Sequence, residues 1–227
     1  MPLLKKPLFK KFADFFTPSA NADKNCIGVF ISIPKNGTYT VKNLLKLNKL
    51  SDRKYDDIII NRKHERGSVL QKNYNFENLF VFCFVRDPYD RTISWYEYHK
   101  GRNLEPYTSL SFEEWIREGM PHHWTILKDS DWEKENISPL LQYNFISDCK
   151  VDFIGHTEHF ERDMKTIIEN LNQKLLDSGR EIEFEFSQVQ KNKSNRLADI
   201  DHYFTPETKK IVSEILHKDF EYFGYDK

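Results

Sequence analysis

The chain has 227 residues, of which 39% are hydrophobic and 30% charged, with 34 Lys and Arg against 35 Asp and Glu. This length fits one domain with a sizeable core, and the composition is that of a folded protein rather than a disordered one. The formal net charge of −1 argues against a nucleic-acid coat protein and against an acidic tail protein, so no nucleic-acid partner is expected.

Residues 1–25 are expected to form an N-terminal tail or short helix ahead of a domain at 26–227. Lysines interrupt the apolar residues of this segment, which argues against a signal peptide, and a helix on a membrane surface is the alternative. No run of 18 apolar residues predicts a membrane span. The three cysteines, Cys26, Cys83 and Cys149, are too far apart for a paired zinc motif and are typical of a reducing compartment, so we expect a cytoplasmic protein without a metal site.

Four hydrophobic segments, rich in β-branched and aromatic residues, are typical of strands covered on both faces. They are Cys26–Ile33, Asp57–Asn61, Leu79–Val85 and Val151–His156. A weaker alternating segment, Ile182–Phe186, predicts an edge strand.

Helical patterns separate these strands. They cover Thr38–Asn48, Arg91–His99, Ser111–Glu118, His159–Asp177 and Thr205–Tyr222. Strands that alternate with helices predict an α/β fold, with an open parallel sheet flanked by helices in a single domain. Ligands bind such sheets beyond the carboxyl ends of the strands, so candidate sites are sought there.

The first strand-end motif is PKNGTYT, which begins at Pro34. Free backbone N–H groups at a helix start, with Gly37 for a close approach, make a cradle for an anion. Thr38 and Thr40 add hydroxyl donors, and Lys35 adds a positive charge. The motif is not a Walker A loop, because its lysine precedes its only glycine. An ordinary turn with an exposed lysine is the alternative.

The second strand-end motif is VRDPYDRTISWY. Arg86 ends the strand, where its planar guanidinium can grip a phosphate at two points. Ser94 lies about two helical turns further on and adds a second donor if the helix folds back over the strand end. Arg91 has a structural alternative, as the partner of Asp87 or Asp90, and a salt bridge with Asp87 is the alternative for Arg86.

Together the two motifs resemble those of the sulfotransferases that use 3′-phosphoadenylyl sulfate (PAPS), in the branch with the heparan and chondroitin 2-O-sulfotransferases and their bacterial relatives. PKNGTYT resembles the family's PKxGT[TS] element for the 5′-phosphosulfate, and FVRDPYDRTISWY resembles its RxPxxRxxSxY element for the 3′-phosphate. FIGHTE, the following Asp163, and the closing HYFTPETKKIV and KDFEYFGY are similar to further family segments. The similarity runs from residue 26 to the end and is weakest over 101–138. Tyr39 is a departure, because the family often has a second hydroxyl there.

This resemblance implies a P-loop NTPase-like fold and PAPS as co-substrate, with adenosine 3′,5′-bisphosphate (PAP) as product and no metal. The implied nucleotide-binding residues are Lys35, Asn36, Gly37, Thr38, Tyr39, Thr40, Arg86, Ser94, Lys193 and Ser194. Lys35 is also expected to stabilise charge on the leaving phosphate. For Lys193 and Ser194, in a basic loop, a plain surface loop is the equal alternative.

His64, just past the second strand, is the candidate general base. A strand-end histidine can titrate near neutral pH and accept a proton from a hydroxyl group. Members of the family similarly place a catalytic histidine between the two motifs. The alternative is a surface histidine in a charged stretch, and spacing alone favours that alternative.

The expected acceptor is a hydroxyl group, in the first place on a carbohydrate. Residues 42–72 hold nine Lys and Arg against four Asp and Glu, which favours an anionic acceptor. A catalytically silent nucleotide- or glycan-binding module on the same fold is the alternative function. A kinase-like phosphotransferase is disfavoured, since there is no Walker lysine and no clear carboxylate for Mg²⁺. The sequence leaves the oligomeric state open.

Overall fold

The computed structural model describes residues 26–47, 58–61, 64–122, 132, 137–181, 183–187 and 200–227. Its centre is a parallel sheet of four strands in the order β2-β1-β3-β4. The strands are β1 (Gly28–Ile31), β2 (Ile59–Ile60), β3 (Phe80–Val85) and β4 (Phe153–His156). Because the chain moves from β1 to one side and then crosses to the other, the order of the strands reverses between β1 and β3.

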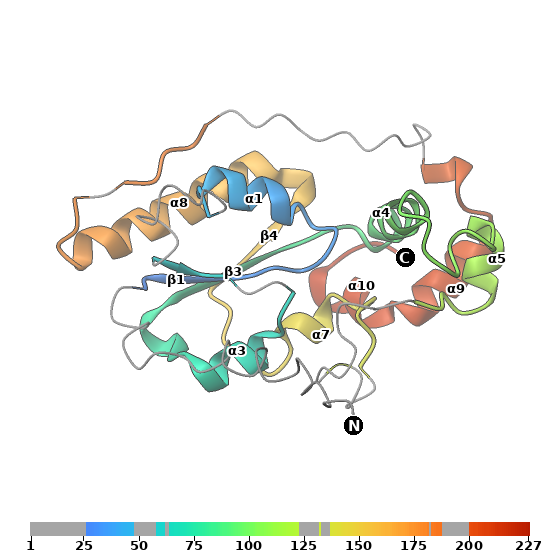
Figure 1. Ribbon diagram of the computed structural model, residues 1–227, viewed down its shortest axis with the longest axis horizontal. Helices are drawn as coiled ribbons and strands as arrows, with labels where there is room; N and C mark the ends of the chain where they lie inside the picture. Colours follow the sequence, from blue (N-terminus) through green and yellow to red (C-terminus); the bar gives the residue numbers. More distant parts are fainter. Residues whose placement is uncertain are drawn as a thin grey trace, which may run out of the picture.

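Helices cover both faces of the sheet (Figure 1). On the sheet faces lie α1 (Thr38–Leu44) and α8 (Phe160–Asp177), and, on the other side, α3 (Gly67–Asn73) and α7 (Tyr143–Ile146). Beyond the strand ends lie α4 (Pro88–Lys100), α5 (Phe112–Arg117), α9 (Pro206–Ile215) and α10 (His217–Phe223). Short 3-10 helices lie at Phe76–Asn78, Thr157–His159 and Ile200–His202. The predicted α/β architecture, a single domain with a P-loop-like strand–loop–helix unit at β1 and α1, is confirmed.

The central strand β3 separates two hydrophobic cores. Alternate residues of a strand face opposite ways, and all six residues of β3 are buried. Its phenylalanines pack with α1 and α8, whereas Val81, Cys83 and Val85 pack with α3 and α7. Phe82 also stacks on Phe30 of β1, with ring centroids 5.2 Å apart. Burial on both faces explains why the strand is a continuous hydrophobic run.

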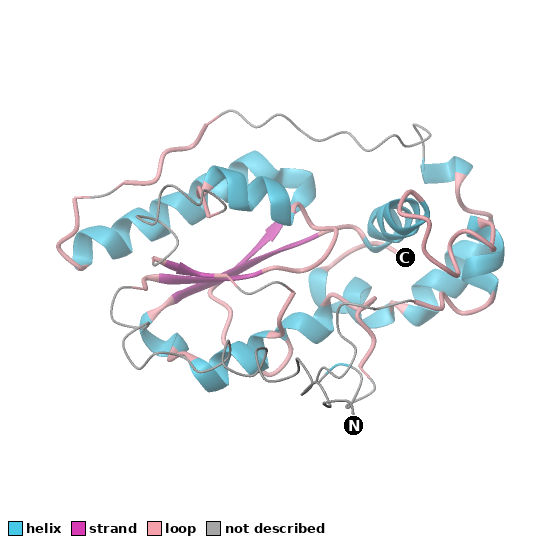
Figure 2. Ribbon diagram, in the orientation of Figure 1, coloured by secondary structure: helices cyan, strands magenta, loops and turns pink. Residues whose placement is uncertain are grey.

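A third core lies beyond the carboxyl ends of the strands, among α4, α5, α9 and α10 (Figure 2). Trp95 and Tyr96 of α4 pack there with Trp115 of α5 and with Val212 and Phe220 of the C-terminal helices. This cluster fixes α4 across the end of the sheet, where the two sequence motifs lie.

The expected edge strand at Ile182–Phe186 is wrong, because residues 183–187 form no strand. Phe184 is buried in the core beside α8. Its backbone N–H donates to the side-chain oxygen of Asn172 at 2.8 Å, and its carbonyl accepts from the Asn172 amide at 2.9 Å. A side chain of α8 thus pairs the backbone groups that a neighbouring strand would otherwise pair.

The expected helix Thr205–Tyr222 is divided into α9 and α10 at Leu216, a buried residue with φ −100°. The break turns Asp219 toward the backbone of α7, where its carboxylate accepts N–H bonds from Gln142 at 2.9 Å and Tyr143 at 2.8 Å. The sequence did not predict α3, which begins at Gly67 and buries Leu70 as its one large side chain.

Residues 1–25, where a tail or short helix was expected, lie outside the described residues. Across the part of the chain that is described, no helix is both long and apolar enough to cross a membrane. Cys26, Cys83 and Cys149 are free thiols, and burial raises the pKa of the Cys83 thiol, as expected of an inert core cysteine.

Candidate functional site

The two sequence motifs meet at the edge of the sheet where the strand order reverses. The first follows β1 and leads into α1, and the second follows β3 and leads into α4. Since β1 and β3 are adjacent and parallel, their carboxyl ends lie side by side. The predicted ligand position therefore combines residues from both motifs.

The first loop has a strained backbone. Lys35 and Gly37 both have left-handed φ angles, of 70° and 73°. Gly37 precedes α1, and the first helical bond runs from the N–H of Val41 to the carbonyl of Gly37 at 3.0 Å. The N–H groups at the start of α1 therefore have no acceptor within the helix and can bind an anion.

The three hydroxyl-bearing residues that follow Gly37 differ in where their side chains lie. Thr38 donates its hydroxyl to the carbonyl of Ile33 at 3.0 Å, so it closes the turn at the end of β1. Tyr39 is 62% exposed, and Thr40 is half-buried. Thus the Thr38 hydroxyl is engaged within the turn and must rotate before it can donate to an anion, whereas its backbone N–H lies at the start of α1.

Asn36 is a buried link between the loops rather than an exposed ligand. Its amide donates to the carbonyl of Phe84 at 2.7 Å and to the side-chain oxygen of Gln142 at 2.6 Å. Both acceptors are oxygens, which fixes the orientation of the amide and leaves the Asn36 oxygen without a protein partner. The side chain ties the loop after β1 to the end of β3.

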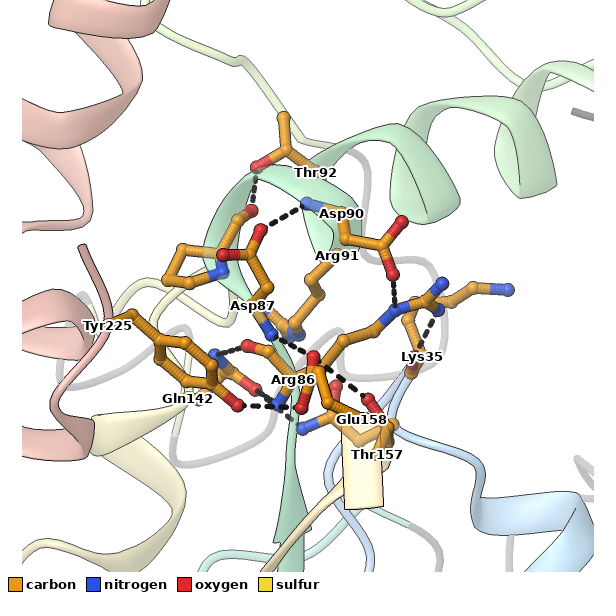
Figure 3. A network of polar contacts seen from close by, with 12 residues as sticks. Lys35, Arg86, Asp87, Asp90, Arg91, Thr92, Gln142, Thr157, Glu158 and Tyr225 are labelled. Carbon is orange, nitrogen blue, oxygen red and sulfur yellow. Dashed lines mark hydrogen bonds and ion pairs between the residues drawn. The ribbon is translucent and has the colours of Figure 1, made fainter. Parts of the chain in front are cut away.

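Arg86 extends from the end of β3 toward the first loop (Figure 3). Its Nε donates to Asp90 at 2.5 Å, and its Nη1 donates to the carbonyl of Lys35 at 3.1 Å. The expected alternative partner, Asp87, instead caps α4 by accepting from the N–H of Asp90 at 2.8 Å. A guanidinium has five N–H donors, so the Arg86 group retains donors on Nη1 and Nη2 for an anion.

Arg91 is structural, as one interpretation of the sequence held, but its partners are not the carboxylates of its own motif. It is buried, and its guanidinium donates to the carbonyls of Pro34 at 3.1 Å, Pro139 at 3.2 Å and Leu140. Burial lowers the pKa of Arg91 to about 10, against an opposing effect of Asp219. The side chain joins the first loop to the segment before α7.

Gln142 completes this network and was not anticipated from the sequence. Its side-chain oxygen accepts from Asn36 and, at 2.9 Å, from the backbone N–H of Arg86. Its amide donates to the carbonyl of Arg86 at 2.8 Å. A lone glutamine next to a helix of four residues carries no local signal for this role, and only the complete burial of its side chain reveals it.

Ser94 lies on the face of α4 that meets the first loop. Arg91, Ser94 and Tyr98 share this face because an α-helix has about 3.6 residues per turn. Arg91 contacts Pro34, and the ring of Tyr98 lies 3.7 Å from the Lys35 ammonium. Ser94 itself is buried on this face, and its phosphate-binding role stays a prediction.

The Lys35 ammonium lies in a positive environment. Burial is the main cause that lowers its pKa to about 8, and the nearby guanidinium groups of Arg86, Arg91 and Arg102 contribute to the same shift. Several positive charges gathered in a partly buried site raise the attraction for an anion.

His64 is held against the end of β1. Its backbone N–H donates to the Ser32 hydroxyl at 3.0 Å, and its ring Nδ1 lies 2.9 Å from the Ser32 carbonyl. A carbonyl can only accept, so in the neutral ring Nδ1 carries the proton and the lone pair lies on Nε2. His64 also has a left-handed φ of 56°, and Ser32 is three residues before Lys35.

The two further segments singled out in the sequence also meet here. Glu158 accepts from the backbone N–H of Asp87 at 2.8 Å and from the hydroxyl of Tyr225 at 3.1 Å. Asp163 accepts from the backbone N–H of His156 at 2.7 Å. Burial raises the pKa of Asp87, which lies close to Asp90 and Glu158. The C-terminus is thus bound to the start of α4.

Two predicted residues cannot be placed. Lys193 and Ser194 lie outside the described residues, so the expectation that they belong to the site stays a prediction. The other predicted residues, apart from the exposed Tyr39, lie in or against the two loops or at the end of β1.

Comparison with known proteins gives three findings. A sequence profile described as "Sulfotransferase family" matches residues 22–226. An uncharacterized protein of Archaeoglobus fulgidus is 30% identical over 96 residues, which make up 42% of this chain and 70% of that protein. The crystal structure of mouse sulfotransferase SULT7A1 complexed with PAP matches with a TM-score of 0.42 and 14% identity, over 88% of this chain and 84% of that one.

We expect Gln142→Leu to lower the free energy of unfolding by about 2–4 kcal/mol, because the buried N–H and carbonyl of Arg86 both lose their partner. Urea denaturation of the two proteins measures the difference. Gln173→Leu is the matched control, since Gln173 is exposed and its side chain bonds, within the described part of the chain, to Asp177 on the same helix. An effect of Gln142→Leu as small as the control's, within about 0.5 kcal/mol, would refute the structural role of Gln142.

Proposed function

The chain belongs to the sulfotransferase family, and from that premise we propose that it transfers a sulfuryl group from PAPS to a hydroxyl group of a carbohydrate. The observation that carries the proposal is the contact between the two motifs. Arg86 donates to the carbonyl of Lys35 at 3.1 Å, so two cationic residues from separate strand ends face one ligand position. Such a pair suits a nucleotide with phosphate groups at both its 5′ and 3′ positions.

The donors around this position fit the charges of PAPS. Lys35 and the N–H groups of residues 37–40 would hold the 5′-phosphosulfate, and Arg86 with Ser94 would hold the 3′-phosphate. Asn36 would act indirectly, since its amide is engaged with Phe84 and Gln142. Because the carboxylate of Asp90 already pairs with Arg86, the guanidinium is oriented before the nucleotide arrives.

Lys35 would stabilise the departure of the phosphate. When bound, PAPS supplies the sulfuryl group, whose bond to the phosphate oxygen breaks as a bond to the acceptor oxygen forms. By analogy with phosphoryl transfer, catalysis is then mainly positioning and charge stabilisation. The Lys35 ammonium would neutralise the negative charge that develops on the bridging oxygen, and its rigid left-handed backbone limits reorganisation during the reaction.

His64 would accept the proton from the acceptor hydroxyl. The contact of its Nδ1 with the Ser32 carbonyl supports this role, because it selects the tautomer with a basic Nε2. Ser32 belongs to the same strand end as Lys35, so one segment anchors both groups. A left-handed backbone at a histidine is uncommon and is typical of functional sites.

The acceptor class rests on the sequence. The excess of Lys and Arg over residues 42–72 supports an anionic carbohydrate as the acceptor. Incubation with radiolabelled PAPS and a panel of neutral and anionic glycans tests the proposed function directly. Transfer to an anionic glycan is expected, and absence of label on every hydroxyl-bearing acceptor, despite binding of PAP, would contradict it.

We expect Lys35→Ala to lower kcat at least about a hundredfold, as loss of one stabiliser of transition-state charge commonly does. Affinity for PAP should also depend on pH. Since the pKa of Lys35 is about 8, the ammonium is charged below pH 8 and PAP affinity should fall above it, by at most about tenfold per pH unit.

Lys35→Arg is the control for this pH dependence, because arginine stays charged throughout the range. Calorimetric titration with PAP between pH 7 and pH 9.5 provides the measurement, and the phosphates of PAP are already ionised there. A wild-type profile as flat as that of Lys35→Arg would show that Lys35 does not hold the nucleotide.

We expect His64→Asn to lower kcat by about two to four orders of magnitude while PAP affinity changes less than twofold. Asparagine tolerates the left-handed backbone, so the change removes the imidazole without new strain. His217→Ala is the matched control, because the ring of the exposed His217 also contacts a backbone carbonyl, that of Glu214 at 3.1 Å. Full turnover in His64→Asn would show that another group accepts the proton.

We expect Arg86→Ala to weaken PAP binding about ten- to a hundredfold while affinity for adenosine 5′-monophosphate changes little, because Arg86 is assigned to the 3′-phosphate. Asp90→Asn controls for the broken ion pair, since it removes the partner and keeps the guanidinium. Equal losses for both nucleotides in Arg86→Ala would contradict the assignment.

A further inference from the structure

Tyr98 is an aromatic residue of α4 that core packing does not explain. Its neighbours Trp95 and Tyr96 are 2% and 1% exposed and belong to the third core, among α4, α5, α9 and α10. Tyr98 is 44% exposed, yet it lies on the helix face that meets the loop after β1. An exposed aromatic side chain beside a functional loop calls for a role outside the core.

Two cationic side chains lie over the ring of Tyr98. The Lys35 Nζ lies 3.7 Å from the ring centroid, and the Arg102 guanidinium carbon lies 5.0 Å from it. Both distances are within the roughly 6 Å over which a ring face attracts a cation, and the lysine contact is the closer one. The helix therefore holds the loop twice, through Arg91 on the carbonyl of Pro34 and through Tyr98 on the ammonium of Lys35.

The other groups around Lys35 repel its charge. Arg86 from the end of β3, Arg91 from α4 and Arg102 just after α4 all carry the same sign as the ammonium. Asp90 pairs with Arg86, and no carboxylate of the described residues forms an ion pair with Lys35. Among the described residues, the face of the Tyr98 ring is therefore the group that attracts the ammonium.

We propose that Tyr98 is a positioning residue that holds the Lys35 ammonium at the donor site by contact with its ring face. The proposal rests on the proposed role of Lys35 in sulfuryl transfer. A carboxylate at this position would hold the lysine as well, but it would repel an anionic nucleotide and compete with it for the ammonium. A ring attracts the cation without adding a negative charge to the site.

Tyr98→Phe and Tyr98→Leu separate the ring from the hydroxyl and from simple bulk. We expect Tyr98→Phe to keep kcat within about twofold of the wild type and Tyr98→Leu to lower kcat roughly three- to thirtyfold, the range of a partly buried cation–ring contact. KM for PAPS should rise less than kcat falls, because the backbone N–H groups and Arg86 still bind the nucleotide. Tyr222→Leu, which alters a 57% exposed tyrosine of α10, is the matched control.

A graded series tests the electrostatic origin of the effect. Phenylalanine with one, two or three ring fluorines at position 98 keeps the shape and progressively weakens the negative ring face. We expect log kcat to fall steadily along this series. Equal activity across it, or equal losses in Tyr98→Phe and Tyr98→Leu, would overturn the proposal.

A further readout does not depend on sulfuryl transfer. In protein labelled with ¹³C at the lysine Cε, the Lys35 signal is expected to be shifted by the ring in the wild type and in Tyr98→Phe, and to lose that shift in Tyr98→Leu. Its titration midpoint should fall by about half a pH unit in Tyr98→Leu, since the ring favours the charged form. If the signal behaves so but no transfer occurs, the proposed function fails and the contact stands. If Tyr98→Leu leaves the signal unchanged, the contact itself is refuted.

Discussion

A buried polar network between two strand-end loops is the constraint on which the rest of this structure depends. The loops after β1 and β3 bring backbone N–H and carbonyl groups into the interior, where each unpaired group costs about 1–3 kcal/mol. Gln142 pairs both backbone groups of Arg86 and accepts from Asn36, while Arg91 donates to the carbonyl of Pro34. These side chains fix the distance between the motifs, so the cations of the site are positioned without any ligand.

The same arrangement concentrates positive charge at one point. Lys35, Arg86 and Arg91 would repel one another, and burial adds to the cost of charging Lys35. Three contacts each offset part of that repulsion. Backbone carbonyls accept from Arg91, the Asp90 carboxylate pairs with Arg86, and the ring of Tyr98 lies against the Lys35 ammonium. In the proposed function, an anion with charge at two positions would relieve the remainder, in a preorganised electrostatic environment of the kind that group transfer between oxygens requires.

Helix α4 connects the core to the candidate site, because its start and its two sides contact different parts of the protein. Its start is capped by Asp87 and bound through the backbone to Glu158, which in turn holds the C-terminal Tyr225. One side packs Trp95 into the core among α4, α5, α9 and α10, and the side with Tyr98 contacts Lys35 in the loop after β1. A rigid core thereby supports the position of the Lys35 side chain.

The sequence by itself determined the four strands of the sheet, most helices and the two cationic motifs, because each is encoded by neighbouring residues. A hydrophobic run such as β3 followed directly by Arg86 predicts both a buried strand and a charged strand end, and parallel pairing then brings such ends together. Only the tertiary structure decided which groups hold the site together. Gln142 lies 106 residues from Asn36 and 56 from Arg86, and the division of the last helix at Leu216 serves the distant contact of Asp219 with α7. Contacts of this kind depend on the path of the chain through space, and no local pattern of residues encodes that path.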